Sequence, residues 1–369
     1  MLGWFEKSFN RLRGRFGSAL QSDAEFIESA YREILGRNAD LDGLNHYLRL
    51  LKDGLGRTSV LLSLVTSDEY RRRLAHPVSP LPNLRVQRPD SYRAALDKSN
   101  GQTIQTFCGS SAEDFDWLET QIIANGYYEQ PGVWVLGVDA DKRIIAEMIA
   151  TLTPHRPIEL GCAAGAVIAR LEELGVRAEG VEISAMALAR APSHVRDRIH
   201  QGDLLSLELP QAYDLVFGLD IFEHLNPNRL DKYLEKIAAI STPEAVVFCN
   251  IPAFGEDEIF GTVFPLYIEG WADDAAAGRP FRQMHVDELG YPLHGHLTWA
   301  DARWWRSRFQ SHGFHREVEI ERAFHRKYDA YMRKRAPARQ SYFIFSRNLP
   351  PQRAAAIIAK VGSERSEIS

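Results

Sequence analysis

The chain has 369 residues, of which 45% are hydrophobic and 25% are charged, and its formal net charge is −5 at pH 7. This composition is typical of a globular protein with two or three domains, and the acidic excess argues against a general nucleic-acid binder. Three cysteines, Cys108, Cys162 and Cys249, lie far apart without a C-x-x-C pair, which indicates neither a disulfide framework nor a structural zinc site. No apolar run is long enough to cross a bilayer and no cleaved-signal pattern is present, so we expect a cytoplasmic protein.

Residues 1–20 are predicted to form a basic amphipathic helix. Apolar side chains recur at helical spacing among lysine and arginine residues, at Leu2, Phe5, Phe9, Leu12 and Phe16. Two interpretations stay open. The helix packs on this or another protein, or it contacts an anionic lipid surface as a peripheral element at the inner membrane.

Residues 21–75 contain three short helical segments. Asp40 or Asp42 can cap the second, Gly54 can end it, and Thr58 or Ser59 can begin the third. The segment resembles a helical domain of unknown function similar to phycobilisome linker repeats, at Tyr31, Leu35–Arg37, Asp40, Gly43, Leu44, Tyr47, Gly54, Arg57 and Ser67–Tyr70. The resemblance implies a docking module that binds a protein partner through residues 23–74, whereas the alternative is a plain helical bundle.

Prolines punctuate residues 76–105, which lack apolar periodicity and are predicted to be a linker. Residues 106–348 are predicted to form one domain, in which strands and helices alternate from about Asp141. This alternation is typical of a doubly wound, mostly parallel α/β sheet, so the fold class is α/β preceded by a small all-α domain. A long insert over residues 253–296 is typical of a lid or binding loop, and residues 349–369 form a tail with a loose helix.

The segment IELGCAAG, residues 158–165, follows the first strand of this region. It lacks the G-x-G-x-x-G pattern of dinucleotide-binding proteins, since alanine occupies the second and third glycine positions. Glu159, Gly161 and Gly165 instead resemble motif I of the class I S-adenosylmethionine-dependent methyltransferases, although Ala163 replaces the glycine that is frequent in the middle of that motif. The resemblance extends over residues 141–348.

This resemblance implies a seven-stranded Rossmann-like sheet whose last strand, SYFIFSRN, is antiparallel and pairs with a sixth strand in GFHREVEIERA. It also implies S-adenosylmethionine as cofactor, with S-adenosylhomocysteine as product. Glu182 would accept the ribose hydroxyls, Ile183 would pack on the adenine, and Asp203 with the Leu204 amide would contact the adenine edge. The complete set expected at the cofactor is Glu159, Gly161, Cys162, Ala163, Gly165, Glu182, Ile183, Asp203, Leu204 and Asp220.

Transfer to a hydroxyl requires a base near the acceptor, and histidine suits that role near neutral pH. His296 is the first candidate and His294 the second, while Glu223 and His224 after the fourth strand offer another pair whose alternative role is structural. His285 and Asp287 with the two later histidines could also bind a divalent metal, but simple hydrogen bonding is the favoured explanation of that spacing, and no metal ligand is assigned.

The insert carries seven aromatic residues that suit stacking on sugar rings or packing on the sheet, at Phe254, Phe260, Phe264, Tyr267, Trp271, Phe281 and Tyr291. The basic residues 303–308 and 325–339 offer either a site for an anionic acceptor or a solvated face. We therefore expect a methyltransferase that O-methylates a sugar of a bacterial surface glycan or its precursor, in polysaccharide biosynthesis. The alternatives are a small aromatic or lipid acceptor, and a non-catalytic scaffold of glycan-assembly machinery.

Overall fold

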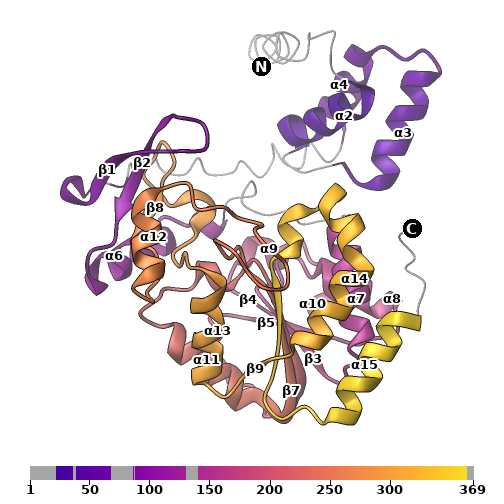
Figure 1. The fold of residues 1–369 in the computed structure, drawn as a ribbon. Coiled ribbons are helices and arrows are strands. Elements are labelled where there is room, and N and C mark those ends of the chain that lie inside the picture. The colour runs from indigo at the N-terminus through magenta and orange to yellow at the C-terminus, as the bar shows by residue number, and fades with distance from the viewer. Residues whose placement is uncertain (1–21, 36–38, 68–85, 87, 130–139, 364–369) are drawn as a thin grey trace. The chain divides into compact units, whose positions relative to one another are not determined.

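The computed structural model describes residues 22–35, 39–67, 86, 88–129 and 140–363 (Figure 1). The chain divides into two units, Met1–Pro80 with Gln130–Asp139 and Leu81–Glu129 with Ala140–Ser369. The helix predicted over residues 1–20 lies outside the described residues. Among the helices that are described, none combines the length and the apolar character that crossing a membrane requires.

The smaller unit is helical, as its sequence predicts. Its elements are α2 (Asp23–Ala30), the π-helical turn η1 (Tyr31–Leu35), α3 (Leu41–Lys52) and α4 (Arg57–Thr66). The Asp40 side chain caps α3 by accepting a hydrogen bond from the Gly43 amide at 2.6 Å. Helix α4 begins one residue before the predicted Thr58. Apolar side chains from all of these elements form one buried core, including Phe26, Ile34 and Leu61.

A seven-stranded sheet forms the centre of the larger unit, in the order β5-β4-β3-β6-β7-β10-β9 (Figure 1). Strand β10 runs antiparallel to both of its neighbours, and the pairs from β5 to β7 are parallel. The strands are β3 (Pro157–Leu160), β4 (Glu179–Glu182), β5 (Ile199–Gln201), β6 (Tyr213–Leu219), β7 (Ser241–Asn250), β9 (His315–Arg316) and β10 (Tyr342–Ser346). The predicted doubly wound sheet with an antiparallel last strand is therefore confirmed.

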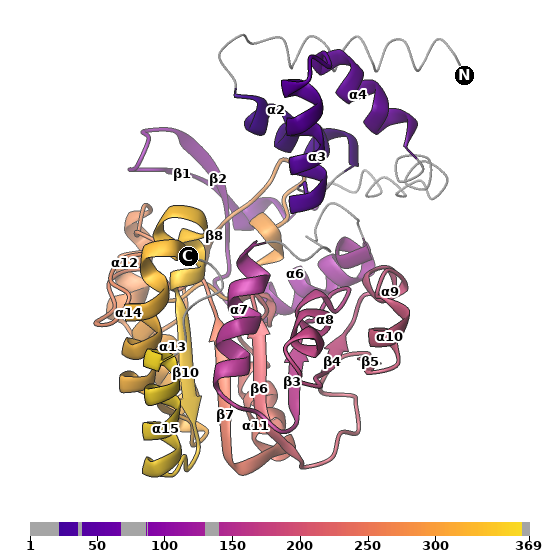
Figure 2. The same cartoon turned by 90° about the vertical axis from the view of Figure 1, so that its right-hand side faces the viewer.

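Helices cover both faces of this sheet because its strands alternate their side chains between two apolar cores. Leu215 and Phe217 face the core beneath α7, α8, α14 and α15, whereas Val216 faces the core beneath α11 and α13. Figure 2 shows α7, α8, α14 and α15 spread in front of the strands. The helices of this unit are α6 (Ala112–Ala124), α7 (Ala140–Thr151), α8 (Ala166–Glu173), α9 (Ala185–Ala189), α10 (Ser193–Arg196), α11 (Leu230–Ile240), α12 (Glu269–Ala276), α13 (Ala302–Ser311), α14 (Val318–Arg335) and α15 (Pro351–Ser363).

The order of the strands places several strand ends together. Strand β3 lies between β4 and β6, so the chain first builds the sheet outward through β4 and β5 and then returns to the other side of β3. Ligands of open α/β sheets bind beyond the carboxyl ends of the strands at such a reversal. The segments that follow β3, β4 and β6 therefore lie where a ligand site is expected.

A second, three-stranded antiparallel sheet corrects two expectations. The predicted linker over residues 76–105 contains, in its described part, the turn η2 (Pro89–Ser91), strand β1 (Tyr92–Leu96) and the start of β2 (Thr103–Cys108). The insert, for which no regular structure is predicted, contributes α12 and strand β8 (Gln283–His285), which pairs with β2. Strand β8 of the insert thus adds a third strand to the hairpin of β1 and β2. The described parts of the predicted linker and of the insert therefore contribute strands to a folded sheet.

The predicted sixth strand is also largely wrong. Only His315 and Arg316 form strand β9, and the VEIERA segment begins the long helix α14. Ile320, Phe324 and Tyr328 recur at a spacing of four and are buried in the sheet core. The apolar residues of VEIERA alternate over too short a stretch to distinguish a strand from a helix. The buried residues that follow at helical spacing make the segment a helix.

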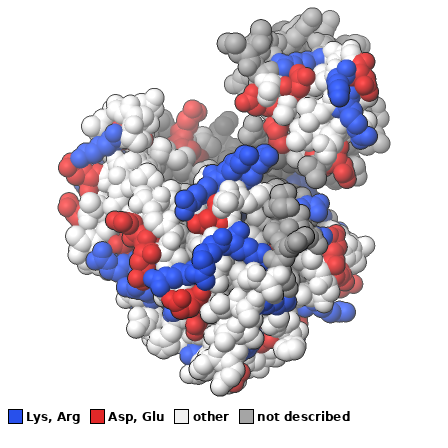
Figure 3. Space-filling view, turned by 45° about the vertical axis from the view of Figure 1, so that its right-hand side comes forward, with Lys and Arg blue, Asp and Glu red and all other residues white. Residues whose placement is uncertain are grey.

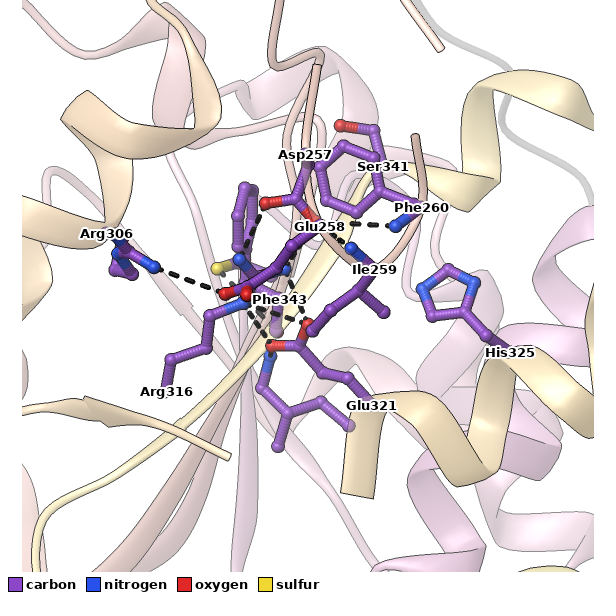
Figure 4. A network of polar contacts seen from close by, with 12 residues as sticks. Asp257, Glu258, Ile259, Phe260, Arg306, Arg316, Glu321, His325, Ser341 and Phe343 are labelled. Carbon is purple, nitrogen blue, oxygen red and sulfur yellow. Dashed lines mark hydrogen bonds and ion pairs between the residues drawn. The ribbon is translucent and has the colours of Figure 1, made fainter. Parts of the chain in front are cut away.

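A buried ion network fixes the start of the insert against the sheet (Figure 4). The Arg316 guanidinium donates to Asp257 at 2.7 and 2.9 Å and to Glu321 at 2.8 Å, and all three side chains are at most 6% exposed. The Glu321 carboxylate also accepts the Ile344 amide of β10 at 2.7 Å. The guanidinium therefore joins the insert, strand β9 and helix α14 at one point.

Candidate active site

The glycine-spaced turn after β3 adopts a left-handed backbone. Gly161 has φ 64°, Ala163 has φ 48° and Gly165 has φ 69°. A Cβ on Gly161 would lie 2.7 Å from the Cδ1 atom of Ile221 and would displace that side chain, and the positive φ itself favours glycine here. Ala163 holds a conformation that disfavours a side chain, and strain of this kind is frequent at functional sites.

Glu182, at the end of β4, holds this turn in place. Its carboxylate accepts hydrogen bonds from the amides of Ala163 and Ser184, both at 2.7 Å, and the residue is 1% exposed. Burial raises its pKa, and these amides oppose the shift. Glu159 is also buried, and burial raises its pKa well above the ordinary value. The Ala163 amide of the turn thus bonds to Glu182 rather than to Glu159.

Two further residues expected at the cofactor differ sharply in exposure. Ile183 is 45% exposed and is one of three large hydrophobic residues that are exposed in the described part of the chain. Leu204 is buried, and the Asp203 carboxylate beside it accepts the Leu205 amide at 3.1 Å and the Tyr233 hydroxyl at 2.9 Å. Ile183 therefore presents an apolar surface one residue after Glu182.

The other two expected residues are held by the protein's own contacts. Cys162 is buried, and its amide donates to the Val181 carbonyl at 3.1 Å, which continues the pairing of β3 with β4. Asp220, after β6, has φ 51° and pairs with Arg339 of the 3-10 helix η6 (Pro337–Gln340). The same guanidinium donates to the Asn250 side chain at 2.6 Å. Arg339 is a site residue that sequence reasoning missed, although it lies in the basic stretch 325–339.

Glu223, His224 and His296 come together beyond the end of β6. One ligand atom from each lies within 4.8 Å of the other two. The His296 Nε2 atom is 3.8 Å from Glu223 Oε1, and the rings of His224 and His296 are 4.8 Å apart. His294 is exposed and its ring lies 5.5 Å from that of His296. Three of the four predicted catalytic residues thus form one cluster, and His294 borders it.

Backbone hydrogen bonds bring these distant segments together. Glu223 and His224 belong to the 3-10 helix η4 (Phe222–His224), and His296 follows η5 (Leu293–Gly295). The amides of Leu297 and Thr298 both donate to the Glu223 carbonyl at 2.8 Å. The Thr298 hydroxyl also donates to the Leu225 carbonyl at 2.6 Å. The position of His296 against Glu223 is therefore fixed by the main chain.

Burial disfavours the charged form of all three members of the cluster. It raises the pKa of Glu223 well above the ordinary value, and the charge of Asp220 raises it further. It lowers the pKa of His224 to about 4 and that of His296 well below the ordinary value, the latter with help from His224 and His294. A neutral histidine can accept a proton or donate a lone pair to a metal.

Tyr128 borders the cluster and was not singled out from the sequence. It belongs to η3 (Tyr127–Glu129), and its hydroxyl lies 3.3 Å from His224 Nδ1. The neighbouring Glu129 carboxylate accepts the amides of Ala185 and Met186 at 3.0 and 2.8 Å, which anchors η3 to the start of α9. The aromatic run in GYYEQPG is the sequence feature from which Tyr128 could have been selected.

The metal set considered from the sequence does not assemble. His285 lies on β8, and the Asp287 carboxylate accepts the amides of Leu289 and Tyr291 in a turn. Over the ranges that the structure describes, the only group of three or more His, Cys, Asp or Glu residues with ligand atoms this close is that of Glu223, His224 and His296.

Most insert aromatics pack inside the protein rather than facing an acceptor. Trp271 is stacked on Phe281, with centroids 5.2 Å apart, and Phe254 contacts both rings. The buried members are Phe254, Phe260, Trp271, Phe281 and Tyr291. These five residues therefore serve packing, and not the sugar stacking that the sequence left open.

The basic stretches pair with acidic neighbours. Arg308 contacts Asp231 at 3.4 Å, and Arg333 contacts Asp329 at 3.1 Å. In Figure 3, acidic side chains lie beside the basic ones on the face shown. This pairing favours a solvated face over an anionic acceptor site.

Two segments match known families. Residues 158–244 match the model of a methyltransferase domain, and residues 12–74 match a domain of unknown function (DUF4214). The first match confirms the expectation of a methyltransferase. The second match covers most of the predicted docking module, but the function of the matching domain is unknown.

Several solved structures are similar at low identity. The 1,6-didemethyltoxoflavin-N1-methyltransferase of Burkholderia thailandensis, solved with S-adenosylhomocysteine, is 15% identical with a TM-score of 0.41, over 66% of this chain and 94% of that chain. An amino pentose methyltransferase from Micromonospora echinaspora, solved with S-adenosylmethionine, is 20% identical with a TM-score of 0.37, over 56% and 90%. A methyltransferase from Mesorhizobium loti is 17% identical with a TM-score of 0.35, over 55% and 96%. No curated protein is significantly similar to the chain.

Proposed function

We propose that the larger unit is an S-adenosylmethionine-dependent methyltransferase that transfers the methyl group to a hydroxyl oxygen. One observation carries the proposal. Two neighbouring parallel strands, β3 and β4, end at the same edge of the sheet, where the strand order reverses. The left-handed glycine turn lies at the end of β3, and the Glu182 carboxylate and the exposed Ile183 lie at the end of β4. That edge is where open α/β sheets bind ligands, and the methyltransferase family match covers it.

The residues present fit the cofactor. Glu182 uses one lone pair of each oxygen for an amide, and a carboxylate has about four acceptor positions, so it can still accept the ribose hydroxyls. Ile183 supplies the apolar surface for the adenine, and Asp203 with Leu204 would meet the adenine edge. Asp220, which forms an ion pair with Arg339, lies between this group and the histidine cluster along the chain. When bound, S-adenosylmethionine supplies an electrophilic methyl group.

His296 is proposed as the base that takes the proton from the acceptor hydroxyl. Its low pKa keeps the imidazole neutral at physiological pH, which is the form that accepts a proton. His296 Nδ1 is buried without a hydrogen-bond partner. Glu223 and His224 lie against His296, and Tyr128 in turn contacts His224.

We further propose a carbohydrate hydroxyl of a surface glycan or its precursor as the acceptor. Tyr128 is partly exposed beside His224, whose ring contacts the proposed base His296, and a partly exposed aromatic ring suits stacking on a sugar ring. Residues 23–74 would dock a protein partner as a separate folded module, since the described helices of this segment share one apolar core. The acceptor and the docking role are narrower proposals than the methyltransferase activity. Either of them can be wrong while the activity is correct.

Calorimetric titration of the purified full chain with S-adenosylmethionine and S-adenosylhomocysteine tests the activity. We expect binding of both at micromolar concentration, and a Glu182→Gln variant should bind at least tenfold more weakly. Glu208→Gln is the matched control, because Glu208 is exposed and lies outside the group described above. Thermal unfolding of each variant separates lost binding from lost folding. Absence of binding by the folded wild type would refute the proposal.

A further inference from the structure

The cluster of Glu223, His224 and His296 has polar atoms that nothing in the described chain satisfies. Glu223 is 1% exposed, yet neither of its carboxylate oxygens has a hydrogen-bond partner, and His296 Nδ1 also has none. An unpartnered buried carboxyl is costly, so such groups usually serve a ligand or a reaction. The three side chains approach within 4.8 Å of one another. They therefore converge on one point from two separate segments of the chain.

We propose that Glu223, His224 and His296 bind one divalent transition-metal cation. Two imidazole nitrogens and one carboxylate oxygen are a donor set that suits first-row divalent cations such as Mn²⁺ or Zn²⁺ better than Mg²⁺, which prefers oxygen ligands alone. A set of three protein ligands leaves coordination positions open, as in catalytic rather than structural metal sites.

The surroundings hold the ligands in fixed orientations. The main-chain bonds from Leu297 and Thr298 to the Glu223 carbonyl fix the segment of His296 against that of Glu223. A hydrogen bond between His224 Nδ1 and the Tyr128 hydroxyl, 3.3 Å apart, leaves the Nε2 atom of His224 for the cation. Partners of this kind set the tautomer and ring direction of metal-binding histidines.

The consequence for the reaction rests on the proposed function, whereas the cation site itself does not. A cation held here would bind the acceptor hydroxyl and lower its pKa, so that the proton leaves to solvent or to a nearby base before the oxygen takes the methyl group. His296 would then act as a metal ligand and not as the free base.

The test uses the full chain after treatment with EDTA and dialysis. Calorimetric titration with MnCl₂ and ZnCl₂ should show one site per chain, and MgCl₂ should bind at least tenfold more weakly than MnCl₂. Glu223→Gln and His296→Ala should each weaken Mn²⁺ binding at least tenfold. His155→Asn is the matched control, because His155 is exposed, lies between α7 and β3 and belongs to none of the groups described above. It should keep the wild-type affinity within about twofold. Electron paramagnetic resonance of bound Mn²⁺ provides a second readout.

Three outcomes would overturn the proposal: no stoichiometric Mn²⁺ or Zn²⁺ binding by the folded wild type, unchanged binding in both ligand variants, or an equal loss in His155→Asn. Thermal unfolding identifies a variant that fails to fold, and the other ligand variant then decides. Titration of the EDTA-treated protein with S-adenosylmethionine separates the two proposals. Cofactor binding without metal binding refutes the cation site alone, and metal binding without cofactor binding refutes the proposed function alone.

Discussion

Replacement of Ile183 by alanine tests the cofactor site with little disturbance of the folded protein. Ile183 follows the Glu182 carboxylate, and 45% of its surface is exposed. Because so much of the side chain already faces solvent, its loss should change the free energy of unfolding only slightly. Adenine binding, in contrast, would cover this surface.

The expected loss of affinity follows from that exposed fraction. Complete burial of an isoleucine side chain contributes about 1.5–3 kcal/mol. Since 45% of Ile183 remains to be covered, contact with adenine would contribute about 0.7–1.4 kcal/mol. Alanine keeps the β-carbon, so we expect a loss of about 1 kcal/mol, which raises the dissociation constant roughly fivefold.

Isothermal titration with S-adenosylhomocysteine measures this change, and Ile123→Ala is the matched control. Ile123 is 51% exposed and lies on α6, outside the group at the ends of β3 and β4. The control should bind with wild-type affinity, and both variants should unfold near the wild-type temperature.

Equal affinity in Ile183→Ala and the wild type would show that Ile183 does not contact the cofactor. An equal loss in both variants would mean that the effect is not local to the site. Either result would refute the proposed contact between Ile183 and adenine. The proposed contact between Glu182 and the ribose is tested separately by Glu182→Gln.

Two further predictions concern stability. Gly161→Ala should destabilise the protein by about 1–3 kcal/mol more than Gly175→Ala, because both glycines are left-handed but only Gly161 would place a Cβ against Ile221; equal unfolding free energies in urea would contradict the crowding. Burial acts to raise the pKa of Glu179, but hydrogen bonds to His200, Tyr213 and Arg156 outweigh it and the net pKa is lowered. Ionised Glu179 therefore stabilises the fold above its unfolded pKa of about 4.3, and this contribution is lost as the pH falls through the lower folded pKa. Glu179→Gln should be less stable than the wild type at pH 7, with a difference that shrinks as the pH falls below about 4.3; urea unfolding at a series of pH values measures it, and a constant difference would refute the linkage.

The sheet was predictable because its signals are local. The strands β3, β4, β6 and β7 are apolar runs bounded by turn residues, and each precedes or follows a helix of recognisable period. The VEIERA segment was assigned incorrectly because six residues are too few to separate period two from period 3.6. The continuation to Tyr328 and Met332 carries the helical spacing.

The small sheet could not be predicted because its determinants are distant in sequence. Strand β1 reads YRAAL and is mostly exposed, so its own residues carry little strand preference. Its neighbour β2 gains a second partner only from β8, within the insert. The prolines before β1 favour turns, but they carry no information about the pairing of β1 with β2.

The candidate site was predictable from the sequence only in part. Glu223, His224 and His296 were each identifiable from the chemistry that a methyl transfer to oxygen requires. Their convergence was not, because it depends on amides of Leu297 and Thr298 that bond to a carbonyl far away in the chain. Main-chain hydrogen bonds carry no residue-type signal, so no pattern in the sequence reports them.

The pairing of β2 with β8 sets a timing problem for synthesis on the ribosome. Thr106 and His285, which face each other across these strands, are separated by about half of the chain. At about 5–20 residues per second, the third strand follows the hairpin by roughly 10 to 35 seconds. During that interval one edge of β2 presents unpaired amides and carbonyls, a surface that recruits other extended chains. A nascent chain stalled before residue 283 would therefore aggregate more readily than one stalled after the insert is complete.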